Sequence, residues 1–143
     1  MNRKEELMRE LMALGAAEKV VRISAPTDVL SVLDSFVCEE QEHFVAVTLN
    51  GAHEVIKTHT VSKGTANSTL VHPRDVFKPA LTDNAVALII AHNHPSGNTE
   101  PSQEDRDITN RLTEAGTLLG IEILDHVIVG RKGFYSFLEN GEI

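Results

Sequence analysis

The chain of 143 residues contains a single cysteine, no tryptophan and only 4% aromatic residues. Because Cys38 has no second cysteine with which to pair, the sequence excludes a module held together by internal disulfides. Long apolar runs are also missing: the most apolar segment, residues 85–91, is strand-sized, whereas a membrane-spanning helix needs roughly 18 apolar residues. The sequence therefore also excludes membrane insertion.

Basic residues are scarce as well, with 13 Lys and Arg against 21 Asp and Glu and a formal net charge of −8. No block of Lys or Arg interrupts this acidic balance, so the chain as a whole repels the phosphate backbone of nucleic acids. No apolar stretch of the signal-peptide type follows residues 1–6. We therefore expect a cytoplasmic protein that binds neither nucleic acid nor membrane.

Hydrophobic residues make up 41% of the chain. A globular chain of about 150 residues buries roughly 68 to 70% of its unfolded surface, which is enough for a core without disulfide or metal staples. This length fits one domain better than two. We therefore expect a single domain in which a bound metal ion would serve chemistry rather than folding.

Helices are predicted where apolar residues recur every three or four positions. One such face runs from Ile108 through Leu112 to Leu119. Pro73 indicates the start of another helix, whereas Pro79 predicts that this helix is shortened or kinked. The helices predicted in this way are residues 5–14, 26–37, 73–81 and 102–119.

Strands are predicted where β-branched and apolar residues form short runs. Residues 42–49 and 54–61 are two such runs separated by residues 50–52, which indicates a hairpin with glycine at its turn. The continuous apolar run 85–92 is typical of a central strand that is covered on both faces. Further strands are predicted at 121–129 and 134–138. Because helices and strands alternate, the predicted class is α/β, with a mixed β-sheet flanked by helices.

The central strand leads into a polar motif in which His92 and His94 are separated by one residue. At a rise of about 3.3 Å per residue, their side chains project to the same side of the strand end, roughly 6.6 Å apart at the backbone. Two imidazoles so placed can converge on one ion at zinc–nitrogen distances of about 2.0 to 2.1 Å. The spacing therefore predicts two ligands of one metal ion.

Asp105, in the first turn of the next helix, offers a third ligand if the loop folds back to the strand end. Two His, one carboxylate and one open position form a catalytic zinc site, in which bound water has a pKa of about 7. Ordinary explanations exist as well. Ser102 and Asp105 have the spacing of a capping box, and a lone His at a strand end is commonly only hydrogen-bonded. The coincidence of all these features favours the metal site.

The same residues resemble the signature of a known family. His92-x-His94-Pro95, six further residues and Ser102-x-x-Asp105 match the JAMM metalloproteases, also called MPN+ or JAB, at every defined position. Wider segments are similar to the RadC branch of that family and extend the likeness over roughly residues 25–140. They are QEHF at 41–44, VHPR at 71–74, HNHPSG at 92–97 and DHVIVG at 125–130.

The resemblance implies a cytidine-deaminase-like α/β fold. An N-terminal helix and lead-in would occupy residues 1–24, and a RadC-like JAB/MPN+ domain would occupy residues 25–143. The implied reaction is hydrolysis of an amide or isopeptide bond by a zinc-bound water, with a peptide or protein as substrate.

The resemblance also implies a role for individual residues. His92, His94 and Asp105 would hold one zinc ion per chain. Glu42 would act as the general base and then carry the proton to the leaving amine. Ser102 would donate a hydrogen bond to the developing oxyanion.

Alternatives remain open at this point. Glu54 and the pair Glu39 and Glu40 also lie near Glu42, and periodicity does not choose among them. The metal could be structural, with His126 or His72 as a fourth ligand, and His126 could instead support a ligand from behind.

Other functions and assemblies are also open. The RadC likeness suggests a DNA-repair accessory protein without hydrolase activity, against which the charge argues. A cytidine deaminase would need two cysteines in its PCxxC ligand pair. Pairing of hairpin edges between two chains would form a homodimer.

Overall fold

The computed structural model describes residues 2–17, 20–33, 41–64 and 71–143, which form four helices and one five-stranded sheet. Within these residues, no helix is both long and apolar enough to cross a bilayer. The helices are α1 (Arg3–Ala17), α2 (Pro26–Leu33), α3 (Pro73–Thr82) and α4 (Gln103–Leu119). The strands are β1 (His43–Leu49), β2 (Val55–Lys63), β3 (Ala87–Asn93), β4 (Glu122–Gly130) and β5 (Gly133–Ser136).

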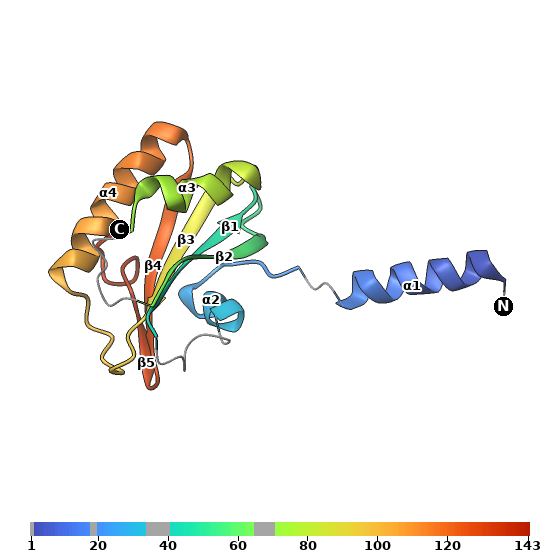
Figure 1. Ribbon diagram of the computed structural model, residues 1–143, viewed down its shortest axis with the longest axis horizontal. Coiled ribbons are helices and arrows are strands. Elements are labelled where there is room, and N and C mark those ends of the chain that lie inside the picture. Colours follow the sequence, from blue (N-terminus) through green and yellow to red (C-terminus); the bar gives the residue numbers. More distant parts are fainter. Residues whose placement is uncertain (1, 18–19, 34–40, 65–70) are drawn as a thin grey trace.

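The sheet is mixed and has the strand order β2-β1-β3-β4-β5. β1 pairs antiparallel with both β2 and β3, β3 pairs parallel with β4, and β4 pairs antiparallel with β5. In Figure 1, α3 and α4 cover one face of this sheet and α2 lies on the other. The predicted hairpin and the predicted α/β class with a mixed sheet are confirmed.

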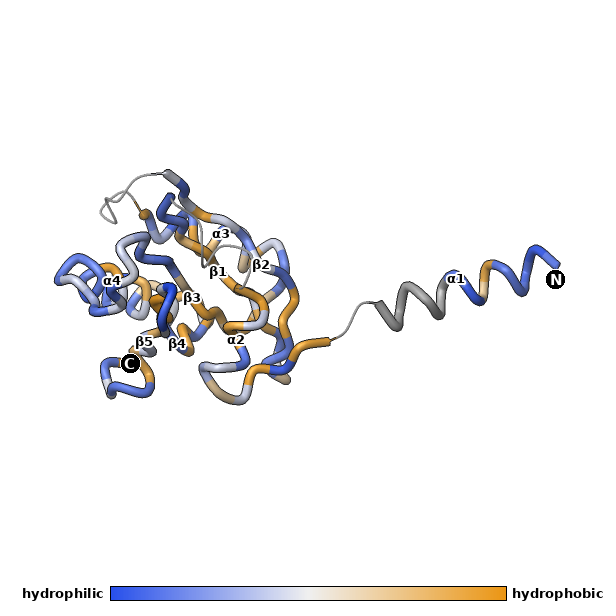
Figure 2. Tube along the Cα trace, turned by 90° about the horizontal axis from the view of Figure 1, so that it is seen from below, coloured by the Kyte–Doolittle hydropathy of each residue, from blue (hydrophilic) through white to orange (hydrophobic). Residues whose placement is uncertain are grey.

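Strand β3 lies at the centre of the core, and all seven of its residues are buried. Because successive side chains point to opposite faces, Leu88 and Ile90 pack in the cluster under α3 and α4. Ile89 and Ala91 pack in the cluster with residues of α2. Figure 2 shows the apolar residues of β3 and the more hydrophilic residues of α4. The predicted central strand, covered on both faces, is confirmed.

Helix α1 confirms the predicted helix over residues 5–14 and extends it at both ends. Its side chains Leu7 and Met8 are 43% and 53% exposed. Figures 1 and 2 show the helix projecting away from the sheet and the other helices. The division of the chain between residues 24 and 25 stays a prediction.

Helices α2 and α3 begin at their predicted prolines. The predicted end of α2, near residue 37, lies outside the described residues. α3 continues past Pro79 to Thr82, so the helix is not shortened, and the alternative of a kink at Pro79 stays a prediction. Proline removes the hydrogen bond to the carbonyl group four residues earlier, which belongs to Asp75. Asp75 is exposed in the first turn, so water can replace that bond.

The last strand is shorter than predicted, because β5 ends at Ser136 and Leu138 lies 49% exposed in the following turn. The buried Asp125 on β4 accounts for this turn. Its carboxylate accepts hydrogen bonds from Ser136 Oγ at 2.6 Å and from the backbone N–H of Leu138 at 3.0 Å. These hydrogen bonds hold the chain after Ser136 against Asp125 on β4, so β5 does not continue to residue 138.

The apolar face predicted for α4 is correct at Ile108 and Leu112, which are buried, but wrong at Leu119, which is 49% exposed. Near its C-terminal end, the helix instead meets the start of β4 through Gly116. A Cβ atom at this position would lie 2.3 Å from the carbonyl oxygen of Ile121. The close approach of the two backbones therefore requires glycine.

Replacing Gly116 with Ala is expected to lower the free energy of unfolding by about 2 to 3 kcal/mol, because the backbone of α4 must move away from β4. Thermal denaturation followed by circular dichroism should show a melting temperature roughly 5 to 10 °C lower. Gly133→Ala is the matched control, since nothing lies within 4 Å of a Cβ atom there. Equal melting temperatures for the two variants would contradict this account of the packing.

Candidate metal centre

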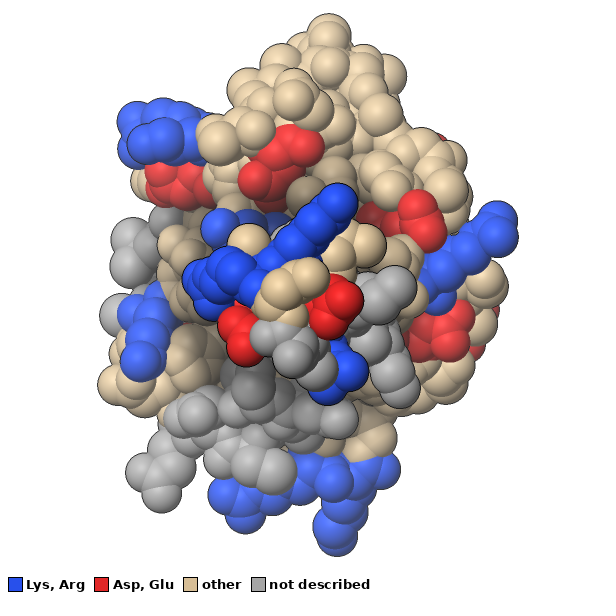
Figure 3. Space-filling model, turned by 90° about the vertical axis from the view of Figure 1, so that its right-hand side faces the viewer, with Lys and Arg blue, Asp and Glu red and all other residues tan. Residues whose placement is uncertain are grey.

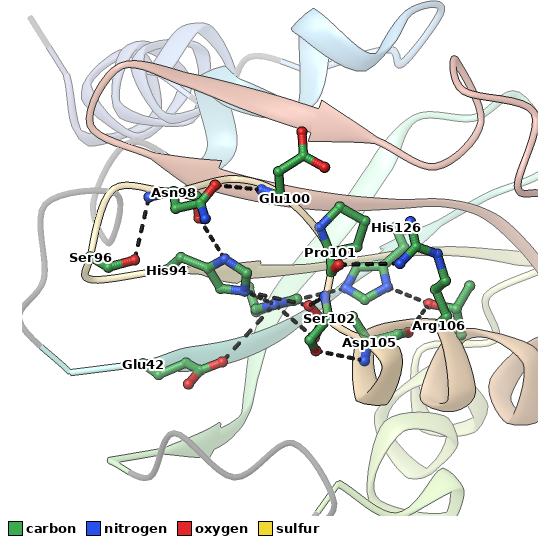
Figure 4. A network of polar contacts seen from close by, with 12 residues as sticks. Glu42, His94, Ser96, Asn98, Glu100, Pro101, Ser102, Asp105, Arg106 and His126 are labelled. Atoms are coloured by element: carbon green, nitrogen blue, oxygen red, sulfur yellow. Dashed lines mark hydrogen bonds and ion pairs between the residues drawn. The ribbon is translucent and has the colours of Figure 1, made fainter.

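Four side chains from three segments meet at one end of β1 and β3 (Figure 4). The Nε2 atoms of His92 and His94 lie 2.9 Å apart. The carboxylate of Asp105 lies 3.2 Å from Nε2 of His92 and 3.5 Å from Nε2 of His94. The Oε1 atom of Glu42 lies 4.0 Å from Nε2 of His92. The potential ligand atoms of Glu42, His92 and His94 all lie within 4.8 Å of one another. The structure brings these predicted residues together, while their roles stay predictions.

The strand register explains why Glu42 meets the histidines. β1 is antiparallel to β3 with Phe44 opposite His92, so the residue just before β1 lies beside the end of β3. Residues two apart share a face of the sheet, and Glu42 and Phe44 therefore face the side covered by α4. Phe44 stacks on the ring of His92, with centroids 5.9 Å apart and ring planes at 12°.

Asn93, between the two histidines, holds the segment that carries Glu42. Its side-chain oxygen accepts a hydrogen bond from the backbone N–H of His43 at 2.6 Å. Its side-chain nitrogen donates to the carbonyl oxygen of Gln41 at 3.0 Å. Both backbone neighbours of Glu42 are thus bonded to one fully buried side chain of β3.

The other upstream glutamates lie elsewhere or outside the described residues. Glu54 follows the hairpin turn, where its carboxylate accepts a hydrogen bond from Asn50 Nδ2 at 3.0 Å. Glu39 and Glu40 fall in the part of the chain that the structure does not describe. Among the described glutamates, Glu42 is therefore the one that lies beside the histidines.

Ser102 and Asp105 form a complete capping box at the start of α4. Ser102 Oγ accepts from the backbone N–H of Asp105 at 3.1 Å, and Asp105 Oδ2 accepts from the backbone N–H of Ser102 at 2.8 Å. The ordinary explanation of this spacing is therefore correct. It does not exclude the ligand role, because the cap fixes the carboxylate while the same carboxylate faces the histidines.

The loop after β3 orients His94. Its Nδ1 atom lies 2.6 Å from the carbonyl oxygen of Asn98. Because a carbonyl oxygen only accepts hydrogen bonds, Nδ1 carries a proton, and a neutral ring then presents a lone pair on Nε2. The loop crosses β4 so closely that a Cβ atom at Gly130 would lie 2.7 Å from the carbonyl oxygen of Gly97. Glycine at position 130 therefore allows the loop to lie against β4 while the carbonyl group of Asn98 contacts His94.

The centre is buried on one side and open on the other. The side chains of His92 and Asp105 are 1% and 3% exposed. Those of His94 and Glu42 are 20% and 15% exposed. Solvent therefore reaches the centre along the side lined by His94 and Glu42, unlike a fully enclosed structural metal site.

The pKa shifts of the charged groups follow from this partial burial. Burial raises the pKa of Glu42, against the opposing influence of His92 and His94. The hydrogen bond with Asp105 raises the pKa of His94. Burial alone would raise the pKa of Asp105, but contacts with both histidines and with the Ser102 backbone N–H hold it well below its usual value. Asp105 is therefore a carboxylate that favours a positive charge beside it.

The donor set fits a zinc ion. Zinc–ligand distances of about 2.0 to 2.1 Å in tetrahedral geometry place neighbouring donor atoms about 3.3 Å apart. The contacts among His92, His94 and Asp105, at 2.9, 3.2 and 3.5 Å, bracket this separation. Imidazole nitrogen and carboxylate oxygen are also common zinc ligands.

Two other histidines considered from the sequence lie outside the donor group. His126 Nε2 lies 2.8 Å from Nδ1 of His92, which places this ring behind the ligand and away from the shared centre. His72 is exposed and precedes α3. Sequence reasoning missed Thr109, which contacts His126 at 2.6 Å. The only signal for it was its position one helical turn after Asp105.

The chain is similar to known proteins over most of its length. A family model described as the RadC-like JAB domain matches residues 23–142. A UPF0758 protein of Rubrobacter xylanophilus is 53% identical over 120 residues, which are 83% of this chain and 52% of that protein. UPF0758 proteins of Staphylococcus haemolyticus and Methanospirillum hungatei are 45% and 50% identical, over 95% and 79% of this chain and 60% and 51% of their own lengths. The chain thus spans little more than half of these relatives, and it belongs to the RadC-like JAB domain family.

Proposed function

We propose that this chain is a zinc-dependent hydrolase that cleaves an amide bond in a peptide or protein. The observation that carries the proposal is the convergence of two imidazoles and one carboxylate, with Glu42 4.0 Å from His92 Nε2 on the open side. His92, His94 and Asp105 would hold the metal ion. A zinc ion in such a site lowers the pKa of water to about 7 and polarises a carbonyl group.

Glu42 and Ser102 supply the remaining chemistry of the proposal. The Glu42 carboxylate accepts the proton of the attacking water and delivers it to the leaving amine. Burial raises the pKa of Glu42, which is the direction that favours a base that must later act as an acid. Ser102 Oγ already accepts the Asp105 backbone N–H, so its own hydrogen remains to be donated to the oxyanion.

Surface charge supports a peptide substrate over nucleic acid. The net charge is −8, and a nucleic-acid ligand would require clustered basic residues to neutralise its phosphates. On the face shown in Figure 3, the Lys and Arg side chains are spread over the surface, and several of them have Asp or Glu side chains beside them. This pattern favours the hydrolase over the DNA-repair accessory protein suggested by the likeness to RadC.

Metal removal tests the proposal. We expect the purified chain to hold about one zinc ion by elemental analysis, since catalytic sites of this kind bind one ion. Dialysis against a chelator should abolish cleavage of internally quenched fluorogenic peptides and of a lysine isopeptide conjugate, and added zinc should restore it. A chain that takes up no zinc, or whose cleavage survives complete metal removal, would contradict the proposal.

A further inference from the structure

A buried histidine and a buried threonine lie behind the metal centre and have no part in the chemistry proposed above. On β4, His126 places its Nε2 atom 2.8 Å from Nδ1 of His92. Its Nδ1 atom lies 2.6 Å from Oγ1 of Thr109 on α4. His126 and Thr109 are 0% and 1% exposed, and the His126 ring stacks on Phe137 with planes at 10°. A chain of polar contacts therefore runs from α4 to His92.

The direction of each hydrogen bond in this series of contacts follows from the last of them, the contact of Thr109 with Asp105. Thr109 Oγ1 lies 2.6 Å from the carbonyl oxygen of Asp105, which can only accept. The single hydroxyl hydrogen of Thr109 is therefore donated to Asp105. Consequently, the hydrogen between Thr109 and His126 belongs to Nδ1 of His126.

The same reasoning continues to the metal ligand. Burial favours the neutral imidazole, and a neutral His126 with its proton on Nδ1 has a lone pair on Nε2. That lone pair accepts a hydrogen bond from His92, so the proton of His92 lies on Nδ1. The Nε2 atom of His92, which lies 2.9 Å from Nε2 of His94, is left with its lone pair facing the centre.

We propose that Thr109 and His126 are positioning residues, which set the tautomer of His92 so that its Nε2 atom binds the metal ion. The inference rests on the proposed zinc site and explains how the more buried of its two histidines is prepared for binding. His94 needs no such chain, because the carbonyl oxygen of Asn98 fixes its tautomer directly.

The bond from Thr109 to Asp105 also has an ordinary explanation, because threonine in a helix often bonds to the carbonyl group four residues earlier. Thr113 makes the same bond to the carbonyl oxygen of Thr109, at 2.8 Å. It differs in being exposed, whereas Thr109 is buried against His126. Thr113 therefore provides a matched control on the same helix.

Zinc affinity, measured by competition with a chelating dye, tests the inference. Thr109→Val keeps the side-chain shape without the hydroxyl group, and we expect its zinc affinity to be about ten- to a hundredfold lower than that of the wild type. Thr109→Ser keeps the hydroxyl group and should restore the wild-type affinity. Thr113→Val should bind zinc like the wild type. Equal affinities for Thr109→Val and Thr113→Val would overturn the inference.

Nitrogen-15 NMR of the histidine rings gives a second test that needs no variant to fold. In the metal-free wild type, His126 should carry its proton on Nδ1. A wild-type His126 protonated on Nε2 would overturn the inference even if zinc binds. A wild-type chain that binds no zinc would overturn the proposed site together with the inference.

Discussion

Replacing Glu42 with Gln is expected to slow amide hydrolysis by about 10²- to 10⁴-fold, the usual contribution of a general base. The amide side chain would keep the size of the original and its place before β1, but it would not accept a proton from the attacking water. Bound zinc should stay at the wild-type level, because the centre keeps His92, His94 and Asp105. Cleavage of fluorogenic peptides and elemental analysis of the same sample measure both effects.

Glu54→Gln serves as the control for this change, because Glu54 bonds to Asn50 at the hairpin and lies away from the centre. It should cleave peptides like the wild type. The Glu42 variant also separates two roles for that residue, since the ligand atoms of Glu42, His92 and His94 lie within 4.8 Å of one another. Loss of zinc together with activity would make Glu42 a ligand and would refute its role as the base.

Replacing His92 with Ala is expected to weaken zinc binding by at least about a hundredfold, beyond the range for partners that only support a ligand. The variant lacks an imidazole that is 1% exposed and lies within 3.5 Å of both other proposed ligands. Competition with a chelating dye measures the loss, and circular dichroism shows whether the chain still folds.

His59→Ala is the matched control for the loss of a histidine. His59 lies on β2, away from the centre, and its Nε2 atom lies 2.6 Å from the carboxylate of Asp83. The control variant should therefore bind zinc with unchanged affinity. If the His92 variant retained zinc as tightly as the His59 variant, the assignment of His92 as a ligand would fail.

The sequence allowed the two histidines to be placed correctly because strand alternation depends only on local backbone geometry. Asp105 could be placed opposite them only on the condition that the loop folds back. The structure meets that condition through Gly130, where the loop and β4 approach each other closely. Glu42 came from the family resemblance alone, because its position depends on which residues pair between β1 and β3.

Residues whose importance rests on distant contacts could not be predicted. Asp125 lies within the predicted strand 121–129, yet its carboxylate ends β5 by accepting hydrogen bonds from Ser136 and Leu138. Thr109 looked like any polar residue on a helix, because its contact with His126 spans 17 positions in the chain. Periodicity describes single elements, and these roles arise only where elements meet.

The contacts of Asn93 have a consequence for how such a site could diversify. Its side chain joins the Glu42 segment to the strand that leads into both histidines, so the sheet holds the proposed base and the two proposed histidine ligands in register. Residues 96–101 lie outside the strands and helices. Substitutions among their exposed side chains would change the surface beside His94 without altering the spacing on which the proposed bond cleavage depends.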